Sequence, residues 1–494
     1  MTNLRWRGAI RIFRHARRNR PNGASPTRRF GVALGSAIAL GLKVFAAFTI
    51  AAAFSIHEVR AQSFSNLNAL EGLAPVSTLL NTAAGKAALR HNFFVTAVIQ
   101  NGNSWASGLL PFPDQEQQAL RDAAITSENG YELADGLGTS LGGAYQSLTH
   151  YTSPDDGKTS DFNNISPAIA RLFAYAGATE LSDSSTGKYF FANATIDGKT
   201  PVSANAQAVI ARINGITDVF GKAYDAPSGS QAGDRYGDPR PFQTELRLTP
   251  IFGKDFFGVE SSNIAYLLGP TQDLTNSPAF PSGHTTYGYT EALLFAILVP
   301  QRYPQMVARA AEYGNSRIVL GAHYAMDVLA GRTLAMYDLA QLLANRTGYV
   351  GLNLNGTEID DFRKAVADAR ADLTAALEAR CGNAIGACAT RDDSRFHDPA
   401  KNQLFYETTQ TYDLPAIFAE TVAPEDVAKV APEAGYLLTA AFPYLSLAQA
   451  DAILTATEGP GGGFLDNGSA FGVYSRLDLY RASQMAIELA PKGQ

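Results

Sequence analysis

The sequence predicts a mainly α-helical fold, because apolar residues recur at helical spacing in most of its long segments, whereas strand signals are few and short. The composition is that of a folded globular chain, with 46% hydrophobic and 17% charged residues among 494. Polar, turn-rich stretches at 151–164, 226–241 and 459–463 indicate loops or turns. The helices that we expect span residues 114–148, 165–179, 203–223, 285–298, 303–343, 358–380, 424–457 and 474–489.

The N-terminal segment has the pattern of an export signal. Nine arginines precede residue 30, and an apolar run with Lys43 as its only charge follows at 31–54. The small residues Val59 and Ala61 stand where a signal peptidase requires them. We therefore expect a signal peptide at 1–61, cleavage after Ala61, and a periplasmic or secreted protein. An uncleaved membrane anchor is the alternative, since the run is nearly long enough to span a bilayer.

The chain without this segment is acidic. Residues 1–61 hold 11 basic residues and 1 acidic residue, and their removal leaves 29 basic and 45 acidic residues, a net charge of −16. Such a charge disfavours binding to nucleic acid or to anionic membrane surfaces. No later apolar run is long enough to cross a bilayer, so we expect no stable membrane association after cleavage. We divide the remainder into a helical domain at 62–350 and a C-terminal helical extension at 351–494.

The two cysteines, Cys381 and Cys388, have six residues between them. In an oxidising compartment, such a close pair predicts a local disulfide bond. We set aside a metal site at this position, because two thiolates would need further ligands nearby.

Three short segments carry the residues that point to chemistry. They are Asp238-Pro239-Arg240-Pro241-Phe242, Phe280-Pro281-Ser282-Gly283-His284-Thr285, and Ser316-Arg317 followed by His323 and Asp327. Each alone has an ordinary explanation: a solvated arginine, a helix N-cap, and a surface pair on a helix. Their combination, however, supplies what phosphoryl transfer requires, which is mainly positive groups around three equatorial oxygens.

Four of these residues can bind the oxygens of a phosphate group. Arg240 and Arg317 offer fork-shaped pairs of N–H donors. Ser282 and Gly283 open the helix expected to begin near Thr285. Backbone N–H groups at a helix N-terminus bind anions, and glycine permits close approach.

The histidines supply acid–base and nucleophilic groups. His284 stands at the mouth of the anion cradle, where a general acid belongs. His323 and Asp327 are four residues apart and would share one helical face, so that the carboxylate fixes the imidazole tautomer and leaves the other nitrogen able to attack. Arg317 lies six residues before His323, about 120° away around a continuous helix. We therefore expect one helix to end near Gly321 and another to begin near His323.

Together, the three segments resemble the type 2 phosphatidic acid phosphatase superfamily, which includes bacterial non-specific acid phosphatases, lipid phosphatases and vanadate-dependent haloperoxidases. The resemblance covers about residues 230–335, and its second and third motifs are complete. It implies a helical-bundle core with the site at one end, a phosphohistidine formed on His323, Asp327 as its orienting group, and His284 as general acid and base. It also implies that the phosphate oxygens are held by Arg240, Arg317, Ser282 and Gly283.

The first segment departs from the family pattern. The family has a lysine seven positions before Arg240, and this chain has Gly233 there. Arg235 is the nearest residue that could replace the missing charge, and Lys222 and Lys254 are more distant candidates. The loss bears on phosphate affinity and on substrate class, whereas the nucleophile and the acid are unchanged.

These residues and the resemblance predict an exported enzyme that hydrolyses small phosphate monoesters through His323, with no metal ion or other cofactor. Vanadate, which resembles the transition state of phosphoryl transfer, would inhibit it. The alternatives are a haloperoxidase with vanadate as its cofactor, a lipid phosphatase, and a non-catalytic phosphate-binding protein. The haloperoxidase would normally need the lysine that Gly233 replaces, and lipid phosphatases usually have a membrane body of several spans.

Overall fold

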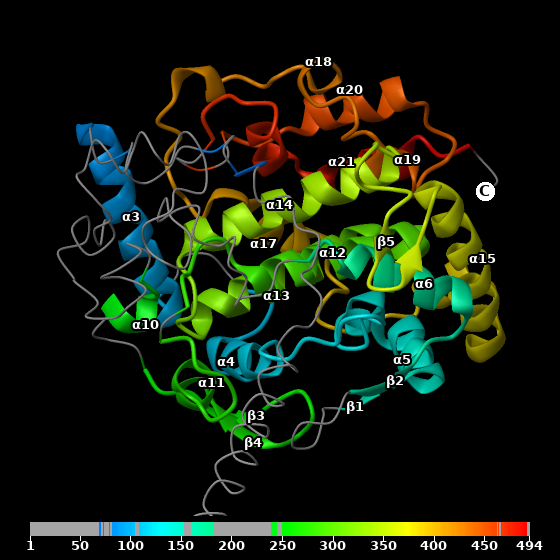
Figure 1. Cartoon of the computed structure of the whole chain (residues 1–494), viewed down its shortest axis with the longest axis horizontal. Helices are drawn as coiled ribbons and strands as arrows, with labels where there is room; N and C mark the ends of the chain where they lie inside the picture. The colour runs from blue at the N-terminus through cyan, green and yellow to red at the C-terminus, as the bar shows by residue number, and fades with distance from the viewer. Residues whose placement is uncertain are drawn as a thin grey trace, which may run out of the picture. The chain divides into compact units, whose positions relative to one another are not determined.

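The structure is a computed structural model that describes residues 82–491 apart from 104–107, 153–159, 181–238, 245–248, 276, 462 and 464–465, together with residues 69–70, 73 and 79. Helices predominate among these residues, as predicted (Figure 1). Their strands form three short two-stranded antiparallel hairpins.

Three helices at the centre of the fold pack closely: α12 (Gly283–Leu298), α13 (Tyr303–Val319) and α14 (Ala325–Leu343). Every residue of α12 is buried, which agrees with a sequence that is apolar on most sides. Glycines permit the close approach between these helices. A β-carbon at Gly288 would lie 2.4 Å from the Tyr313 ring, and one at Gly331 would lie 2.5 Å from the Ser282 carbonyl oxygen.

The remaining elements surround these central helices. Before α12 the helices are α3 (Ala83–Gln100), α4 (Phe112–Arg121), η2 (Leu133–Leu137), α5 (Gly138–Leu148), α6 (Pro167–Gly177), α10 (Pro241–Thr244) and α11 (Asn263–Leu268), and η4 (Pro300–Arg302) precedes α13. After α14 they are α15 (Phe362–Cys381), α16 (Ile385–Ala389), α17 (Pro399–Thr411), η5 (Ala419–Thr421), α18 (Val427–Val430), α19 (Tyr436–Thr439), α20 (Leu447–Thr457), η7 (Gly472–Arg476) and α21 (Leu479–Glu488). The hairpins pair β1 (His150–Thr152) with β2 (Asp161–Asn163), β3 (Phe252–Lys254) with β4 (Glu260–Ser262), and β5 (Asn353–Leu354) with β6 (Thr357–Glu358).

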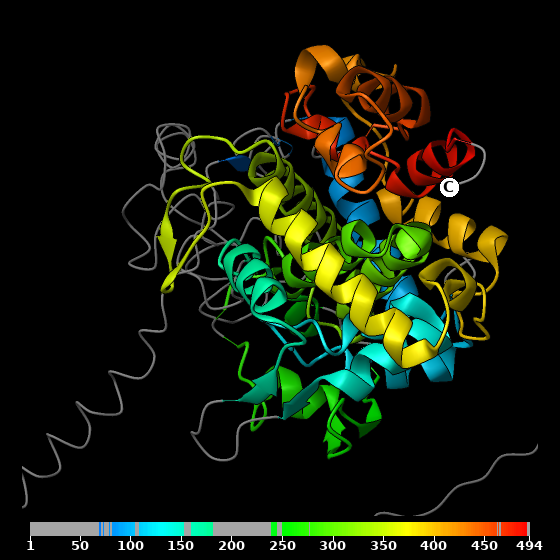
Figure 2. The ribbon, with the colours of Figure 1, turned by 90° about the vertical axis from the view of Figure 1, so that its right-hand side faces the viewer.

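The C-terminal helices share the hydrophobic core of the central helices. α15, the long yellow helix in Figure 2, contacts α5, α6 and α12. α17 and α21 contact α13, and η7 contacts α14. One buried cluster joins both parts of the chain through residues such as Leu294, Met336, Leu373, Tyr406 and Tyr480. Residues 351–494 therefore bury apolar surface that the central helices would otherwise expose.

Three of the eight predicted helical ranges correspond to single helices, and a fourth, 303–343, holds α13 and α14. The ranges 165–179, 285–298 and 358–380 correspond to α6, α12 and α15, whereas 203–223 lies outside the described residues. Three predicted ranges are divided: 114–148 holds α4, η2 and α5, 424–457 holds α18, α19 and α20, and 474–489 holds part of η7 and then α21. Positive φ angles at Gly130 (57°) and Gly138 (87°) help to explain the first division, because such angles interrupt a helix.

Some elements of the structure were not predicted. The stretch 151–164 was expected to be a loop, but β1 and β2 pair at its ends, and the rings of Tyr151 and Phe162 stack across the strands with centroids 5.6 Å apart. Helices α3 and α17 were not predicted as elements. Their N-caps, Thr82 and Asp398, accept backbone N–H groups of the first turn, so a capping signal was present in the sequence.

A disulfide joins Cys381 at the end of α15 to Cys388 in α16, which confirms that prediction. Its Cα atoms are 6.5 Å apart. Within the described part of the chain, no helix is both long and apolar enough to cross a lipid bilayer. The predicted signal peptide lies outside the described residues.

Candidate active site

A sharp turn between α13 and α14 positions the third motif. Gly321 has a φ of 80°. Its N–H donates to the Ile318 carbonyl at 2.9 Å, and the Ala322 N–H donates to the Arg317 carbonyl at 3.1 Å, the paired bonds of a Schellman motif. The predicted helix break at Gly321 is therefore confirmed. The expectation that His323 and Asp327 share one helical face is wrong, because α14 begins only at Ala325 and His323 precedes it.

His323 and Asp327 nevertheless lie together through the N-terminal geometry of α14. Asp327 Oδ2 accepts the Tyr324 N–H at 2.8 Å and lies 3.5 Å from His323 Nδ1. The other ring nitrogen, Nε2, lies 3.1 Å from Nη1 of Arg240. Arginine can only donate, so Nε2 is the acceptor and the ring proton is on Nδ1, facing the carboxylate. This tautomer gives Nε2 the lone pair that a nucleophile requires.

Arg240 is fully buried beside this histidine. Its Nη1 also donates to the Ala322 carbonyl at 3.1 Å. Its Nε donates to the Ser277 carbonyl at 2.8 Å, and its Nη2 donates to Ser277 Oγ and to the Pro278 carbonyl, both at 3.0 Å. All five N–H donors therefore have protein acceptors, and a phosphate oxygen would have to replace one of them to be bound as predicted.

Ser282 and Gly283 connect the second motif to the third. Ser282 is the N-cap of α12, and its Oγ accepts the N–H and the hydroxyl of Thr285 at 3.2 and 2.8 Å. Because its oxygen accepts both bonds, its own O–H is the group that could donate to an anion. The Ser282 N–H donates to the Asp327 carbonyl at 3.0 Å. The N-terminus of α12, which carries positive partial charge, is thereby fixed against the start of α14.

His284 lies in the first turn of α12 and is almost fully buried. Its Nε2 lies 3.3 Å from the Ala123 carbonyl oxygen and 3.2 Å from the Tyr266 hydroxyl. A carbonyl only accepts, so Nε2 carries a proton in this arrangement. The ring stacks on Tyr313 at 6.4 Å, with an interplanar angle of 13°.

Arg317 is fully buried on the same side as His284. Its Nη1 donates to the Asp122 carbonyl at 2.8 Å, and its guanidinium lies 4.9 Å from the centroid of the Tyr266 ring. Tyr266 in α11 thus contacts both the predicted acid and a predicted phosphate-binding arginine. Neither Tyr266 nor the segment at Asp122 was predicted, because both reach the site through contacts distant in sequence.

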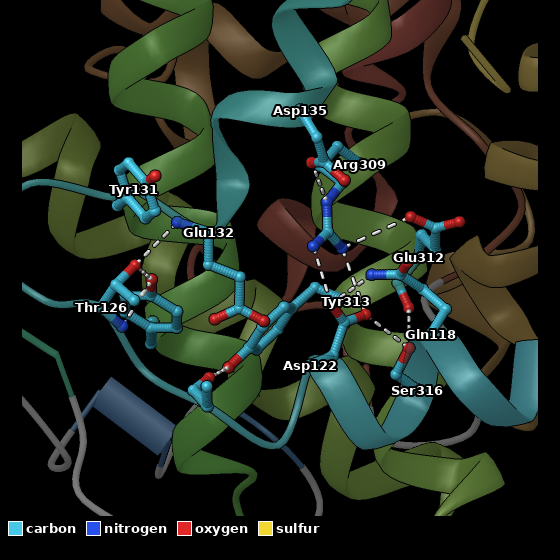
Figure 3. Close-up of polar contacts among 12 residues, drawn as sticks. Gln118, Asp122, Thr126, Tyr131, Glu132, Asp135, Arg309, Glu312, Tyr313 and Ser316 are labelled. Atoms are coloured by element: carbon cyan, nitrogen blue, oxygen red, sulfur yellow. Dashed lines mark hydrogen bonds and ion pairs between the residues drawn. The ribbon is translucent and has the colours of Figure 1, made fainter. Parts of the chain in front are cut away.

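A buried charge network holds the Asp122 segment in place (Figure 3). The Asp122 carboxylate accepts Arg309 Nη2 at 2.7 Å and Nη1 at 3.2 Å, and also accepts the Ser316 hydroxyl at 2.7 Å. Arg309 Nε donates in turn to Asp135 at 2.7 Å. Since Arg309 and Asp122 are fully buried, this pair lacks screening by water. It fixes the two successive carbonyls, of Asp122 and Ala123, that contact Arg317 and His284.

Two carboxyl groups in this network differ in protonation. Burial, together with the negative charge of Asp122, raises the pKa of Glu132 well above its usual range. Burial would also raise the pKa of Asp135, but Arg309 and Arg395 outweigh that effect, so the pKa of Asp135 is lowered. The fold therefore favours the neutral form of Glu132 and the charged form of Asp135.

The candidate site thus has two halves. The nucleophile half comprises Arg240, His323 and Asp327, and the acid half comprises His284, Arg317, Tyr266, Asp122 and Ala123. Ser282 and Gly283 lie between them. Arg235, Lys222 and Gly233 lie outside the described residues, and Lys254 is an exposed residue of β3. Within the described ranges, no group of three or more His, Cys, Asp or Glu side chains is placed to hold a metal ion.

Comparison with known proteins identifies relatives of this region. Residues 219–343, which contain all three motifs, match the model of the PAP2 superfamily. An acid phosphatase of Zymomonas mobilis subsp. mobilis is 41% identical over 71 residues, which are 14% of this chain and 27% of the relative. A non-specific acid phosphatase of Providencia stuartii is 33% identical over 101 residues, 20% of this chain and 38% of the relative. A lipid A 1-phosphatase of Rhizobium etli is 42% identical over 53 residues, 11% of this chain and 23% of the relative. The chain therefore spans less than two fifths of the length of each of these relatives.

Proposed function

We propose that this chain is a phosphatase of the PAP2 type that hydrolyses phosphate monoesters through a phosphohistidine intermediate, because its residues 219–343 match the model of the PAP2 superfamily and the relatives that it resembles are named acid phosphatases. The observation that carries the proposal is the arrangement of the two ring nitrogens of His323 and the tautomer that it implies. Its Nδ1 faces Asp327 and its Nε2 accepts a bond from Arg240, so its lone pair is on the nitrogen remote from the carboxylate. That arrangement is the one expected of a nucleophilic imidazole.

In the first step, His323 Nε2 attacks phosphorus, and the bond between phosphorus and the ester oxygen breaks. Protonated His284 transfers its proton to the departing oxygen, which leaves as an alcohol. Asp327 stabilises the positive charge that forms on the His323 ring. In the second step, neutral His284 takes a proton from water, the resulting hydroxide attacks phosphorus, and the bond between Nε2 and phosphorus breaks to release inorganic phosphate.

Arg240, Arg317 and the N-terminus of α12 hold the equatorial phosphate oxygens in this proposal. Binding of a phosphate oxygen moves an Arg240 N–H from Nε2 of His323 to the substrate, which exposes the lone pair for attack. The reaction needs no metal ion in this scheme, because protein groups supply both the proton transfer and the charge stabilisation. Vanadate acts as an inhibitor that occupies the same cradle.

Trapping of the phosphoenzyme tests this mechanism. The protein is mixed with a radiolabelled, activated phosphate monoester and quenched in alkali, in which phosphohistidine is stable. The wild type and His284→Ala should retain acid-labile label, because a good leaving group departs without a proton. His323→Ala should retain none. His397→Ala, which alters an exposed histidine outside the site, is the matched control. Label retained by His323→Ala would disprove its role as nucleophile, and activity lost in EDTA and restored by a divalent ion would disprove the absence of a metal.

A lipid phosphate monoester is the second candidate substrate, since one relative is named a lipid A 1-phosphatase. Assays with a water-soluble monoester and with a detergent-dispersed lipid monoester separate the two candidates. We expect the soluble ester to have the higher kcat/KM. The reverse order would favour the lipid.

We also propose that the protein is exported to the periplasm or beyond. The basic and apolar leader and the Cys381–Cys388 disulfide support this, because disulfides persist in oxidising compartments. N-terminal sequencing of protein from the periplasmic fraction should begin at Gln62. An intact leader on that protein would contradict the proposed cleavage.

A further inference from the structure

A cavity of about 580 Å³ is lined mainly by aromatic side chains, and Arg121 in its lining directly precedes Asp122 and Ala123 of the acid half of the site. The rings of Tyr131, Tyr151, Phe256 and Phe257 line it, together with the side chain of Arg121. The volume is within the range of small-molecule sites, which are usually apolar with a few polar groups.

The aromatic rings come from three separate segments of the chain and contact one another. Phe256 meets Tyr131 edge to face at 5.9 Å and Phe257 edge to face at 5.5 Å. Tyr151 of β1 stacks on Phe257 at 6.4 Å, with an interplanar angle of 29°. Arg121 lies over the Phe256 ring at 5.0 Å. All four rings are half-buried, so they are fixed by their neighbours while part of each surface stays accessible. Such a surface is suited to a flat aromatic group.

Three of the segments that line this cavity are connected to His284 by a short path. Arg121 lies two residues before Ala123, whose carbonyl is 3.3 Å from His284 Nε2. The hairpin that carries Phe256 leads directly into α11, whose Tyr266 hydroxyl is 3.2 Å from the same nitrogen. Tyr131, seen beside Glu132 in Figure 3, belongs to the turn that contains Thr126. The Thr126 hydroxyl lies 3.0 Å from the hydroxyl of Tyr287, one turn after His284 in α12. These segments therefore supply both the lining of the cavity and the groups that contact or adjoin the proposed general acid.

The in-line geometry of phosphoryl transfer indicates which part of the substrate would reach this cavity. The nucleophile and the leaving oxygen are in line on opposite sides of phosphorus, so the alcohol part of the ester lies on the side of His284. We infer that this cavity binds an aromatic group of the departing alcohol, and that the preferred substrates are phosphate monoesters of alcohols that carry an aromatic ring. The inference rests on the proposed phosphatase function.

Two esters with the same leaving-group chemistry test the inference. Phenethyl phosphate and ethyl phosphate both release a primary alcohol, and they differ in the aromatic ring. The wild type should have a higher kcat/KM for phenethyl phosphate. Tyr151→Ala and Phe257→Ala should each lower kcat/KM for that ester about threefold to tenfold, the range expected for one aromatic contact, and leave ethyl phosphate within about twofold. The control is Phe252→Ala, which removes a ring that is 70% exposed in the same hairpin and outside the cavity.

The outcomes separate this inference from the proposed function. Equal kcat/KM for the two esters in the wild type would overturn the proposed role of the cavity, and so would equal losses for both esters in the variants. Neither result would contradict the proposed phosphatase function. If the wild type hydrolyses neither ester, the proposed phosphatase function is contradicted instead. In that case, calorimetric titration with 3-phenylpropylphosphonate and propylphosphonate still tests the cavity. The aromatic phosphonate should bind more tightly to the wild type, and Tyr151→Ala should remove the preference; no preference in the wild type would overturn the inference.

Discussion

The two halves of the candidate site are held by different kinds of contact. In the nucleophile half, the turn at Gly321 and the pairing of Asp327 with His323 connect residues close in sequence, and only Arg240 comes from further away. In the acid half, His284 and Arg317 are positioned by Asp122, Ala123 and Tyr266, which belong to distant segments. A turn motif fixes the first half, whereas a buried charge network fixes the second. The acid half should therefore be more sensitive to substitutions outside the motifs.

The largest expected effect separates the two histidines. His323→Ala should abolish turnover of every ester, because it removes the atom that forms the covalent bond. His284→Ala should reduce kcat strongly for alkyl esters and much less for nitrophenyl phosphate, because nitrophenolate needs little protonation. Steady-state kinetics across a leaving-group series measures the difference. Equal losses across the series would show that His284 does not act as the acid.

The second effect tests the charge network. Asp122→Asn keeps the volume but weakens the hold of Arg309 and Ser316 on the segment that contacts Arg317. We expect kcat to fall about 10-fold to 100-fold, because small displacements of catalytic groups are costly. The loss of kcat should be largest for poor leaving groups.

A matched control for Asp122→Asn is Asp135→Asn, which removes another carboxylate partner of Arg309. Asp122→Asn should lose roughly 3–5 kcal/mol of stability, the usual cost of breaking a buried ion pair, and Asp135→Asn should lose less, because the Asp135 side chain is 31% exposed. Chemical denaturation measures that loss. If Asp135→Asn also lost as much kcat, with the same dependence on the leaving group, the specific positioning role of Asp122 would be refuted.

The third effect is smaller and concerns Tyr266. Tyr266→Phe removes the hydroxyl near His284 and keeps the ring beneath Arg317. We expect kcat to fall about fivefold, the equivalent of one hydrogen bond of about 1 kcal/mol, with little change in KM. Tyr266→Leu should in addition raise KM, because Arg317 loses its aromatic partner. An unchanged KM in Tyr266→Leu would argue against a role of this ring in phosphate binding.

The smallest effect on turnover is expected for Glu132→Gln. A raised pKa means that folded Glu132 keeps its proton where the unfolded chain releases it. Its contribution to stability is complete below its ordinary pKa and is lost as the pH rises towards the folded pKa. Gln mimics the neutral acid, so the variant should match the wild type near pH 4 and become more stable than it as the pH rises to 8. Urea denaturation across this range measures the difference. If the stabilities of the wild type and the variant changed with pH in parallel, Glu132 would be charged in the folded protein.

The comparison of the two halves also explains what the sequence could predict. The motifs contain His323, Asp327 and Gly321 within a few residues, so helical periodicity and glycine chemistry located the turn. They also contain His284 and Arg317, but nothing near these residues specified Asp122 or Tyr266 as partners. Those partners follow from the packing of α4 and α11 against the central helices, which local patterns do not encode. The short pairing of β1 with β2 was missed for the same reason, since its stacked rings meet only after the chain has turned.

The protein acceptors around Arg240 affect how tightly this residue would bind phosphate. Each of its five N–H groups already has a protein acceptor, so a bound phosphate exchanges one contact for another. The gain in free energy from that exchange is smaller than for an arginine whose donors point only to water. In the proposed mechanism the same exchange holds inorganic phosphate, and the return of Arg240 to its former acceptors favours release of that product. Under the proposed mechanism, Arg240 would therefore bind substrate and product less tightly than an arginine without these acceptors, which would limit inhibition by the product.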